Sequence, residues 1–328
     1  MSDQPGEPRL PNKAPRLVML GTGDFALPTF LHLLDSGHSV VTLVTQPDRP
    51  QGRKQELIPS RIKLAALERG VPVFQPENVN APESIAHLRS LGVDLMVTAA
   101  YGQILSGDLL AVPTFGGINL HGSILPAYRG AAPVARAIQQ GATETGVTVI
   151  RMTPRIDAGG MMAFASTPIG PDETAGEIEA RLAQIGAPLV ASAIAELAAG
   201  TAKILPQDRS KVTRAPKLGK DDGLIDWTRP ASEIHNLVRA MQPWPMASTH
   251  WLKPDGPSRL IVHETRLTEA SGEPGRVLES TGGCLVVAAG SGAVSLVKVQ
   301  LEGKKAMAAA EFLRGYQLFG AIFANPAR

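Results

Sequence analysis

At 328 residues the chain is long for one domain and comfortable for two, and its apolar runs stay short of the ~20 residues that a membrane span needs. A net charge of +2 excludes a strongly basic nucleic-acid binder, although Lys and Arg outnumber Asp and Glu by four over residues 208–328. The single cysteine, Cys284, excludes internal disulfides and cysteine-rich metal sites, fits a reducing cytoplasm, and is expected to be a small core residue.

The N-terminal part predicts a tail followed by a strand, a glycine turn and a helix. Residues 1–14 are polar and Pro-rich without the apolar stretch of a secretory signal, so a disordered tail is expected. The strand Arg16–Leu20 and the turn Gly21–Ala26 then match the G-x-G-x-x-A dinucleotide fingerprint. The next strand, Val40–Thr45, ends in Gln46-Pro47, where an acidic residue would bind the ribose. Strand, turn and helix are therefore predicted here, and bound NAD is not.

A long loop rich in Pro and Gly follows, from Gln46 to Ser60, and it carries Arg49, Arg53 and Lys54. Loops of this length without secondary structure are usually functional or disordered. Its cations suit a polyanionic substrate, and an ordinary solvated loop is the alternative.

Alternating helices and strands continue to residue 99. They are expected at 61–69 (helix), 73–74 (strand), 81–91 (helix) and 93–99 (strand). Such spacing indicates a doubly wound, Rossmann-like parallel sheet of the α/β class. The loop Tyr101–Leu105, with Gln103 and Ile104, then leaves a strand's carboxyl end. It could wall a pocket for a flat heterocycle or simply connect two elements.

The stretch Gly116–Pro133 contains the main candidate catalytic side chains. Asn119 and His121 are two apart on a short strand, so they project to one face while Leu120 points into the core. Ligands bind at the carboxyl ends of strands in open α/β sheets. An amide there can donate to an oxyanion and an imidazole can move a proton, which is the chemistry of acyl transfer. Alternatively, the amide caps a turn and the imidazole is satisfied by backbone.

The rest of the first domain contains one carboxylate that could join this pair, but only if the fold brings it close. After the stretch we expect a helix to about Gln139, strands at 147–152 and 161–167, and a helix at 175–199. Between the strands lies the turn Thr153–Gly160 with Asp157, 36 residues beyond His121. A carboxylate beside an imidazole orients the ring, whereas an Asp before Ala-Gly-Gly is often only a turn former.

The last third predicts a second domain. The polar, basic run Leu205–Lys220 marks a linker, and a helix is expected near 231–241. Short apolar strands recur at about 247–252, 259–267, 275–279, 284–289 and 293–299. Five short strands with turn signals favour a small barrel, OB-like among the options.

The stretch Gly116–Pro133 resembles the signature N-x-H-G-S-L-L-P-x-x-R-G-A-A-P of the formyltransferases that use 10-formyltetrahydrofolate. Ile124 replaces one Leu of that signature. The loop T-Q-P-D-R-P-x-G-R and four C-terminal blocks are similar to the branch of this family that formylates methionyl initiator tRNA. Those blocks are Thr213–Lys217, Ile225–Trp227, Gln242–Pro245 and Gly303–Met307. Together the matches cover nearly the whole chain beyond residue 15.

The resemblance implies a reaction and a set of roles. A formyl group would pass from 10-formyltetrahydrofolate to the α-amine of methionyl initiator tRNA, without a metal. Asn119, His121 and Asp157 would be catalytic. Folate binding is implied for Ser123, Ile124, Leu125, Pro126, Gln103 and Ile104. Contacts to tRNA are implied for Arg49, Arg53, Lys54 and Lys217.

The expected organisation is a tail at 1–14, a catalytic domain at 15–205, a linker at 206–221 and a tRNA-docking β-barrel at 222–328, in a cytoplasmic monomer. Three alternatives stay open at this point. They are formyl transfer to a small-molecule amine, an NAD-dependent oxidoreductase built on Gly21–Ala26, and a tRNA-binding protein without activity. The basic linker and the barrel speak against the first.

Overall fold

The computed structural model describes residues 15–51 and 56–325. The predicted tail at 1–14 and the predicted tRNA contacts Arg53 and Lys54 lie outside the described residues. The chain forms two compact units, which we treat separately. The first comprises the described residues up to Gly130 with Thr145–Thr167 and Glu179–Arg214, and the second comprises Ala131–Glu144, Pro168–Ile178 and the described residues from Ala215 onward. The predicted domain limits stay a prediction.

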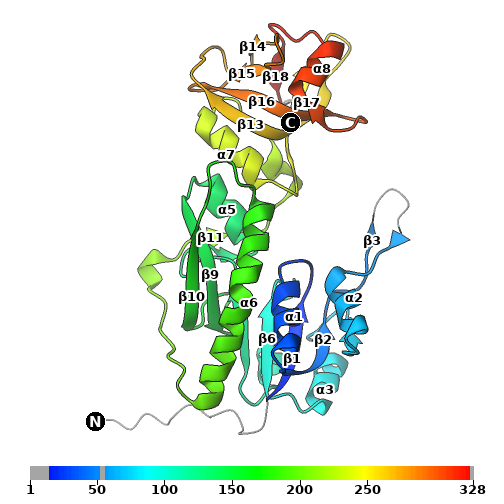
Figure 1. Cartoon of the computed structure of the whole chain (residues 1–328), viewed down its shortest axis with the longest axis vertical. Coiled ribbons are helices and arrows are strands. Elements are labelled where there is room, and N and C mark those ends of the chain that lie inside the picture. Colours follow the sequence, from blue (N-terminus) through cyan, green and yellow to red (C-terminus); the bar gives the residue numbers. More distant parts are fainter. Residues whose placement is uncertain (1–14, 52–55, 326–328) are drawn as a thin grey trace. The chain divides into compact units, whose positions relative to one another are not determined.

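The first unit is built on a seven-stranded sheet in the order β10-β9-β7-β6-β1-β2-β5 (Figure 1). Its strands are β1 (Arg16–Gly21), β2 (Ser39–Val44), β5 (Val73–Phe74), β6 (Leu95–Ala99), β7 (Gly117–His121), β9 (Glu144–Arg151) and β10 (Met161–Pro168). The helices that accompany them are α1 (Leu27–Asp35), α2 (Arg61–Glu68), α3 (Pro82–Ser90), α4 (Gly107–Leu110) and most of α6 (Ala175–Ala199). The predicted α/β class is confirmed.

Strand directions agree with the prediction except at one place. The strands β7, β6, β1, β2 and β5 pair parallel with one another in that order. The strand β9 runs antiparallel to β7, with Asn119 opposite Ile150 and His121 opposite Thr148. The expectation of a parallel sheet throughout was therefore wrong at this side. An antiparallel strand beside an otherwise parallel sheet is a common mixed arrangement.

Alternation along the strands distributes the core over both faces of the sheet. In β1, Val18 and Leu20 join one buried cluster with residues of α3 and α4, so the intervening Leu17 and Met19 face the other side. Leu120 of β7 is also buried and packs against α6, where a Cβ added to Gly186 would lie 2.5 Å from its side chain. The glycine thus lets the helix approach the strand closely.

Helix α6 is long and apolar enough to cross a membrane by length and composition, but 39% of its most apolar window is buried within the protein. Its buried positions include Leu182, Val190 and Ile194. A core helix of a globular domain passes the same test of length and hydropathy, and one helix that passes it is weak evidence for a span.

Desolvation sets the ionisation of the buried Tyr101, which follows β6. Its side chain is 2% exposed, and burial raises the pKa of the phenol from 10.0 to about 12. Between these values the unfolded chain binds fewer protons than the folded one, so the free energy of unfolding falls as pH rises. The loss totals at most about 3 kcal/mol, at about 1.4 kcal/mol for each pH unit.

We therefore expect the free energy of unfolding to fall more for this protein than for the Tyr101→Phe variant between about pH 10 and about pH 12. Urea unfolding of both proteins across this range measures the difference in free energy. Curves that fall in parallel would contradict the assignment.

The predicted loop at 46–60 contains a small hairpin. Strands β3 (Pro50–Gln51) and β4 (Glu56–Leu57) pair antiparallel on either side of the residues that are not described. Before the hairpin, Asp48 pairs with Lys63 of α2, and this ammonium group lowers the pKa of the carboxyl group. The base of the loop is thus attached to the first unit.

The connection out of the first unit contains the short helix η1 (Arg209–Lys211) and the strand β11 (Arg214–Ala215), which pairs with β8 (Arg129–Gly130). Before η1, Leu205 pairs with Met161 at the start of β10.

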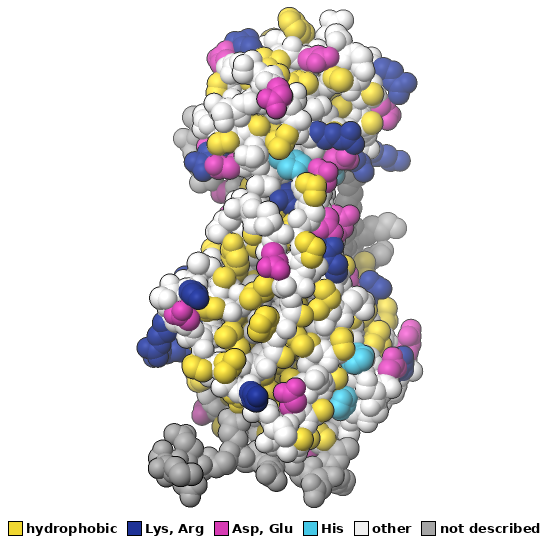
Figure 2. All heavy atoms as spheres, turned by 60° about the vertical axis from the view of Figure 1, so that its left-hand side comes forward, with side chains coloured by type: hydrophobic (Ala, Val, Ile, Leu, Met, Phe, Trp, Pro, Cys, Tyr) yellow, Lys and Arg dark blue, Asp and Glu magenta, His cyan; other side chains and the backbone are white. Residues whose placement is uncertain are grey.

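Figure 2 shows one face of the protein, on which hydrophobic side chains lie among polar and charged ones. Exposed large residues such as Phe164 and Leu205 are ordinary where they occur singly.

The second unit is a nearly closed antiparallel barrel with helices (Figure 1). Its elements are α5 (Pro133–Gln139), η2 (Lys220–Gly223), α7 (Ala231–Ala240), β12 (Ala247–Leu252), β13 (Ser258–Thr268), β14 (Val277–Glu279), β15 (Val286–Ala288), β16 (Ala293–Leu301), β17 (Met307–Ala308), α8 (Ala309–Gly315) and β18 (Ile322–Ala324). The strand order is β14-β15-β16-β13-β12-β18, and β17 pairs with β16.

Backbone hydrogen bonds connect the two ends of this strand order. Phe323 N donates to Gly275 O at 2.7 Å, and Val277 N donates to Ala321 O at 2.8 Å. The interior is filled by buried side chains such as Trp227, Phe312 and Phe323. The five predicted strands are all present, and the predicted barrel is confirmed.

One prediction for this unit was wrong. Cys284 is exposed, not a core residue. It lies at the end of a turn, where its N–H donates to Thr281 O, and β15 begins only at Val286. The apolar run that follows the cysteine is buried from Leu285 onward.

Candidate functional site

The candidate site begins at the carboxyl end of β7, as predicted from the strand pattern. Asn119 is half-buried and His121 is 5% exposed, while Leu120 between them points into the core. Within the described part of the chain, the Asn119 amide group has no hydrogen-bond partner. It is therefore available to donate to a ligand.

The imidazole of His121 is held at both ring nitrogens. Nε2 lies 2.9 Å from Tyr128 O, and because a carbonyl oxygen only accepts, Nε2 carries the hydrogen. Nδ1 lies 3.6 Å from Asp157 Oδ2, which is an ion-pair distance, longer than a hydrogen bond. The Asp157 carboxylate thus faces the ring nitrogen that does not bond to Tyr128. The fold thus brings together the two residues that the sequence separates by 36 positions.

Asp157 is fixed in a tight turn. Its Oδ2 accepts from Gly130 N at 2.9 Å, and its side chain is 12% exposed. Its φ of 48° lies in the left-handed region, which Asp tolerates better than most residues. Two residues later, a Cβ on Gly159 would lie 1.7 Å from Arg151 O, so only glycine fits there.

The loop after His121 is braced by buried hydroxyl groups. Ser123 Oγ donates to Ala127 O at 2.6 Å, and Thr148 Oγ1 donates to Ser123 O at 2.7 Å. The same threonine oxygen accepts from Leu125 N at 3.0 Å. The side chains of Ser123 and Leu125 are buried, whereas Ile124 and Pro126 are half-buried. This loop therefore offers a ligand the latter two side chains and its backbone.

The second predicted folate segment, after β6, is partly occupied by its own contacts. Gln103 Oε1 accepts from Val79 N at 2.9 Å, so this amide stabilises the neighbouring loop. Ile104 is 66% exposed, which leaves its side chain free to cover an apolar ligand. The backbone of Tyr101 accepts from Thr22 Oγ1 and from Gln46 Nε2, which ties this loop to the glycine turn.

The described residues among the predicted tRNA contacts are exposed cations. The Arg49 guanidinium pairs with Glu77 at 2.8 Å, with both side chains largely exposed. Such a surface pair contributes little stability and can be exchanged for another anion. Lys217 belongs to the second unit and is exposed.

Sequence reasoning missed Gln207 of the connecting segment, residues 205–214. Its Oε1 accepts from Arg129 Nε at 3.0 Å and Nη2 at 2.7 Å. Its Nε2 donates to Asp157 O at 2.7 Å. Burial lowers the pKa of the Arg129 guanidinium while Asp157 opposes the shift, and the group stays charged. The run that contains Gln207 reads as solvated linker, and only the block beginning at Thr213 signalled a role for this segment.

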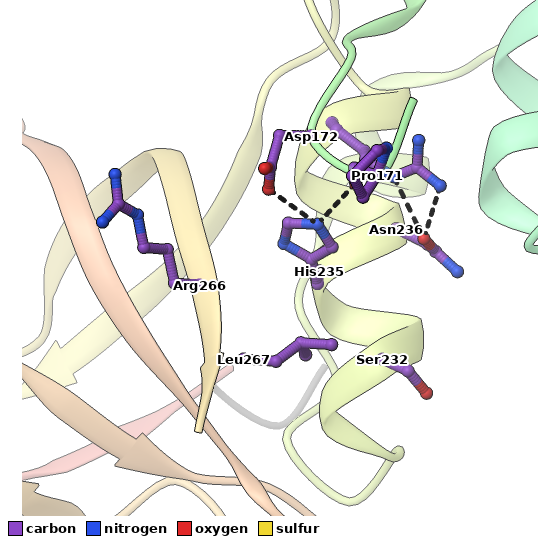
Figure 3. A pocket seen from close by; sticks show the side chains of 8 residues that line it. Pro171, Asp172, Ser232, His235, Asn236, Arg266 and Leu267 are labelled. Atoms are coloured by element: carbon purple, nitrogen blue, oxygen red, sulfur yellow. Dashed lines mark hydrogen bonds and ion pairs between the residues drawn. The ribbon is translucent and has the colours of Figure 1, made fainter. Parts of the chain in front are cut away.

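A separate cavity of about 420 Å³ lies within the second unit (Figure 3). Its lining includes His235, whose ring nitrogens contact Thr265 Oγ1 and Pro171 O, each at 2.9 Å. Arg239 donates to Gly170 O and to Asn236 Oδ1. These polar groups already have hydrogen-bond partners within the protein. The amide of Asn119 has none among the described residues, so the strand end is the better candidate site. Over the described ranges, no group of His, Cys, Asp and Glu could hold a metal ion.

Comparison with known proteins gives a consistent result. A family model described as formyl transferase matches residues 15–194, and one described as formyl transferase, C-terminal domain, matches residues 217–317. The chain is similar to the methionyl-tRNA formyltransferase of Citrifermentans bemidjiense, at 44% identity over 92% of this chain and 94% of that protein. It is 46% identical to the methionyl-tRNA formyltransferase of Pseudomonas syringae pv. tomato, over 88% of this chain and 91% of that one.

Solved structures share the fold at low identity. WlaRD, a sugar 3N-formyl transferase crystallised with dTDP and 5-N-formyl-THF, has a TM-score of 0.64 at 17% identity, covering 90% of this chain and 100% of its own. HypX from Aquifex aeolicus, in complex with tetrahydrofolic acid, has a TM-score of 0.63 at 16% identity, covering 92% of this chain and 47% of its own.

Proposed function

The chain belongs to the methionyl-tRNA formyltransferase family, and on that premise we propose how its residues perform the reaction. It transfers a formyl group to the α-amine of methionyl initiator tRNA, with a tetrahydrofolate-type donor. The observation that carries the assignment of residues is the contact between His121 and Asp157 beside the free amide of Asn119.

The proposed donor is 10-formyltetrahydrofolate, whose formyl carbon is attached to a nitrogen. The amine nitrogen of the methionyl group forms a bond to this carbon, and the bond from carbon to N10 breaks. The amine loses one proton and N10 gains one, so the transfer balances without an oxidant or a metal. The formyl oxygen becomes negative during attack and needs a donor.

Three side chains serve these needs. Asn119 Nδ2 donates to the developing oxyanion, because its hydrogens have no partner among the described residues. His121 stabilises that charge or shuttles the proton, with its ring positioned by Tyr128 O and facing Asp157 Oδ2. Asp157 Oδ2 is occupied by Gly130 N and faces His121, which leaves Oδ1 to receive the proton of the amine.

The folate is proposed to lie against the loops after β6 and β7. Ile104, exposed in the loop after β6, would cover an apolar ring, and Ile124 and Pro126 would contact it from the second loop. Ser123, Leu125 and Gln103 would act indirectly, because their side chains are buried or bonded to backbone.

The tRNA is proposed to contact Arg49, Arg53, Lys54 and Lys217, of which the second and third lie outside the described residues. The excess of basic residues beyond position 208 supports docking by the second unit. We further propose a cytoplasmic monomer that needs no metal.

A formylation assay tests the function. Purified protein with 10-formyltetrahydrofolate should formylate methionyl initiator tRNA and should discriminate against elongator methionyl-tRNA. Absence of formyl-methionyl product would refute it. Product from a small amine, unaffected by competing tRNA, would favour a small-molecule formyltransferase. A fluorescence change on titrating NADH would instead favour the oxidoreductase.

A further inference from the structure

We propose that Gln207 and Thr213, in the connecting segment between the two units, are positioning residues of the formyl-transfer site. This inference rests on the proposed function, since it assigns a role in that same site. Both residues lie outside β7 and its loop, and the contacts of their side chains are to other residues of the protein. They act by holding the backbone on which Asp157 and His121 depend.

Gln207 ties the Asp157 turn to the loop after β7. Its Nε2 donates to two carbonyl oxygens of that turn, those of Asp157 and Gly159, each at 2.7 Å. Its Oε1 accepts two hydrogen bonds from Arg129, at 3.0 and 2.7 Å. The half-buried amide of Gln207 therefore connects the Asp157 turn, through its NH2 group, to the loop after β7, through its oxygen.

Thr213 holds Tyr128, whose carbonyl oxygen bonds to the His121 ring. Its Oγ1 accepts from Tyr128 N at 2.8 Å, and its carbonyl oxygen accepts from Arg129 N at 2.9 Å. The carbonyl oxygen of Tyr128 in turn accepts from His121 Nε2. Tyr128 has a φ of 60°, a conformation that a bulky residue adopts only when its surroundings hold it.

Both contacts matter because the spacing of His121 and Asp157 depends on the positions of two loops. Asp157 and Tyr128 each have a backbone in the left-handed region, and the distance of 3.6 Å between His121 Nδ1 and Asp157 Oδ2 is longer than a hydrogen bond. A small displacement of either loop changes this distance. Misplacement of a reacting group by about 1 Å can cost 10²-fold in rate.

The substitution Gln207→Glu separates the two ends of the amide. The carboxylate still accepts from Arg129, but an oxygen replaces the NH2 group that faces two carbonyl oxygens. We expect kcat to fall about 10-fold to 100-fold with KM for tRNA nearly unchanged. Gln184→Glu is the matched control, because Gln184 is exposed on α6 and no contact of its side chain is seen within the described chain. It should retain wild-type kcat.

A double-mutant cycle separates positioning from a general structural role. If Gln207 acts through Asp157, Gln207→Glu should cost less than about 2-fold once Asp157 is alanine. An equal loss in both backgrounds would overturn the proposal, and so would wild-type kcat in Gln207→Glu.

Thr213 allows a rescue test. Thr213→Val keeps the shape and removes the acceptor of Tyr128 N, and we expect kcat to fall about 10-fold. Thr213→Ser keeps the hydroxyl group and should restore most of the activity. Equal kcat values in the valine and serine variants would count against a positioning role for this hydroxyl.

Amide hydrogen exchange tests, without any turnover, whether Gln207 holds the backbone of the Asp157 turn. In Gln207→Glu, amides of residues 153–160 should exchange faster than in the wild type and in Gln184→Glu. Unchanged exchange there would overturn the inference. A wild-type protein that produces no formyl-methionyl-tRNA would instead refute the proposed function, so the two failures are distinguishable.

Discussion

Asn119→Ala is expected to lower kcat for formyl transfer by about 10²–10³-fold, while KM for both substrates changes little. The amide group sits at the end of β7, half-buried, and within the described residues nothing competes for its hydrogens. A hydrogen-bond donor without a partner in the free enzyme can stabilise a charge that exists only in the transition state. Loss of such a donor therefore appears in kcat.

Single-turnover kinetics with methionyl initiator tRNA measure this effect. Asn119→Asp is the informative companion, because it keeps the size of the side chain but puts a carboxylate beside the developing oxyanion. It should be at least as damaging as alanine. Wild-type rates in either variant would remove Asn119 from the mechanism.

Asp157→Asn is expected to lower kcat by about 10²–10⁴-fold, the usual range for loss of a proton-transfer group. The amide can still accept from Gly130 N, so the turn retains its shape. It cannot take up the amine's proton, and it no longer presents a negative charge to His121.

The second unit supplies a matched control. Its His235 lies 3.5 Å from Asp172, a spacing similar to that of His121 and Asp157, but the Asp172 side chain is 78% exposed. Asp172→Asn removes a carboxylate from a His–Asp pair outside the proposed site and should leave kcat unchanged. If both Asp→Asn variants behave alike, the assignment of Asp157 is wrong.

Local pattern alone predicted much of the fold. The strand ending in His121, the helix at 175–199 and the five barrel strands follow from alternation, helical periodicity and turn residues, and all were found. The antiparallel direction of β9 could not be predicted, because strand direction depends on the path of the chain between β7 and β9. Cys284 was misassigned because its apolar neighbours begin only one residue later, after a turn.

The candidate site was predictable only in part. Asn119 and His121 are two residues apart, so their common face follows from the geometry of any strand. Asp157 was placed beside them by resemblance, and its contact with His121 at 3.6 Å needed the tertiary structure. Gln103, for which folate contact stays a prediction, also accepts from Val79 N, a contact that its position in the sequence does not reveal.

Sequence by itself determined the family of this protein and the common face of Asn119 and His121, because a specific motif and the alternation along a strand are local properties. Tertiary structure decided which distant groups contact the Asp157 turn and the loop after β7. Gln207 lies 50 residues from Asp157 and 78 from Arg129, within a run that reads as solvated linker. Its contacts exist because the chain returns across the catalytic loops, and such long-range hydrogen bonds leave no periodic trace in a sequence.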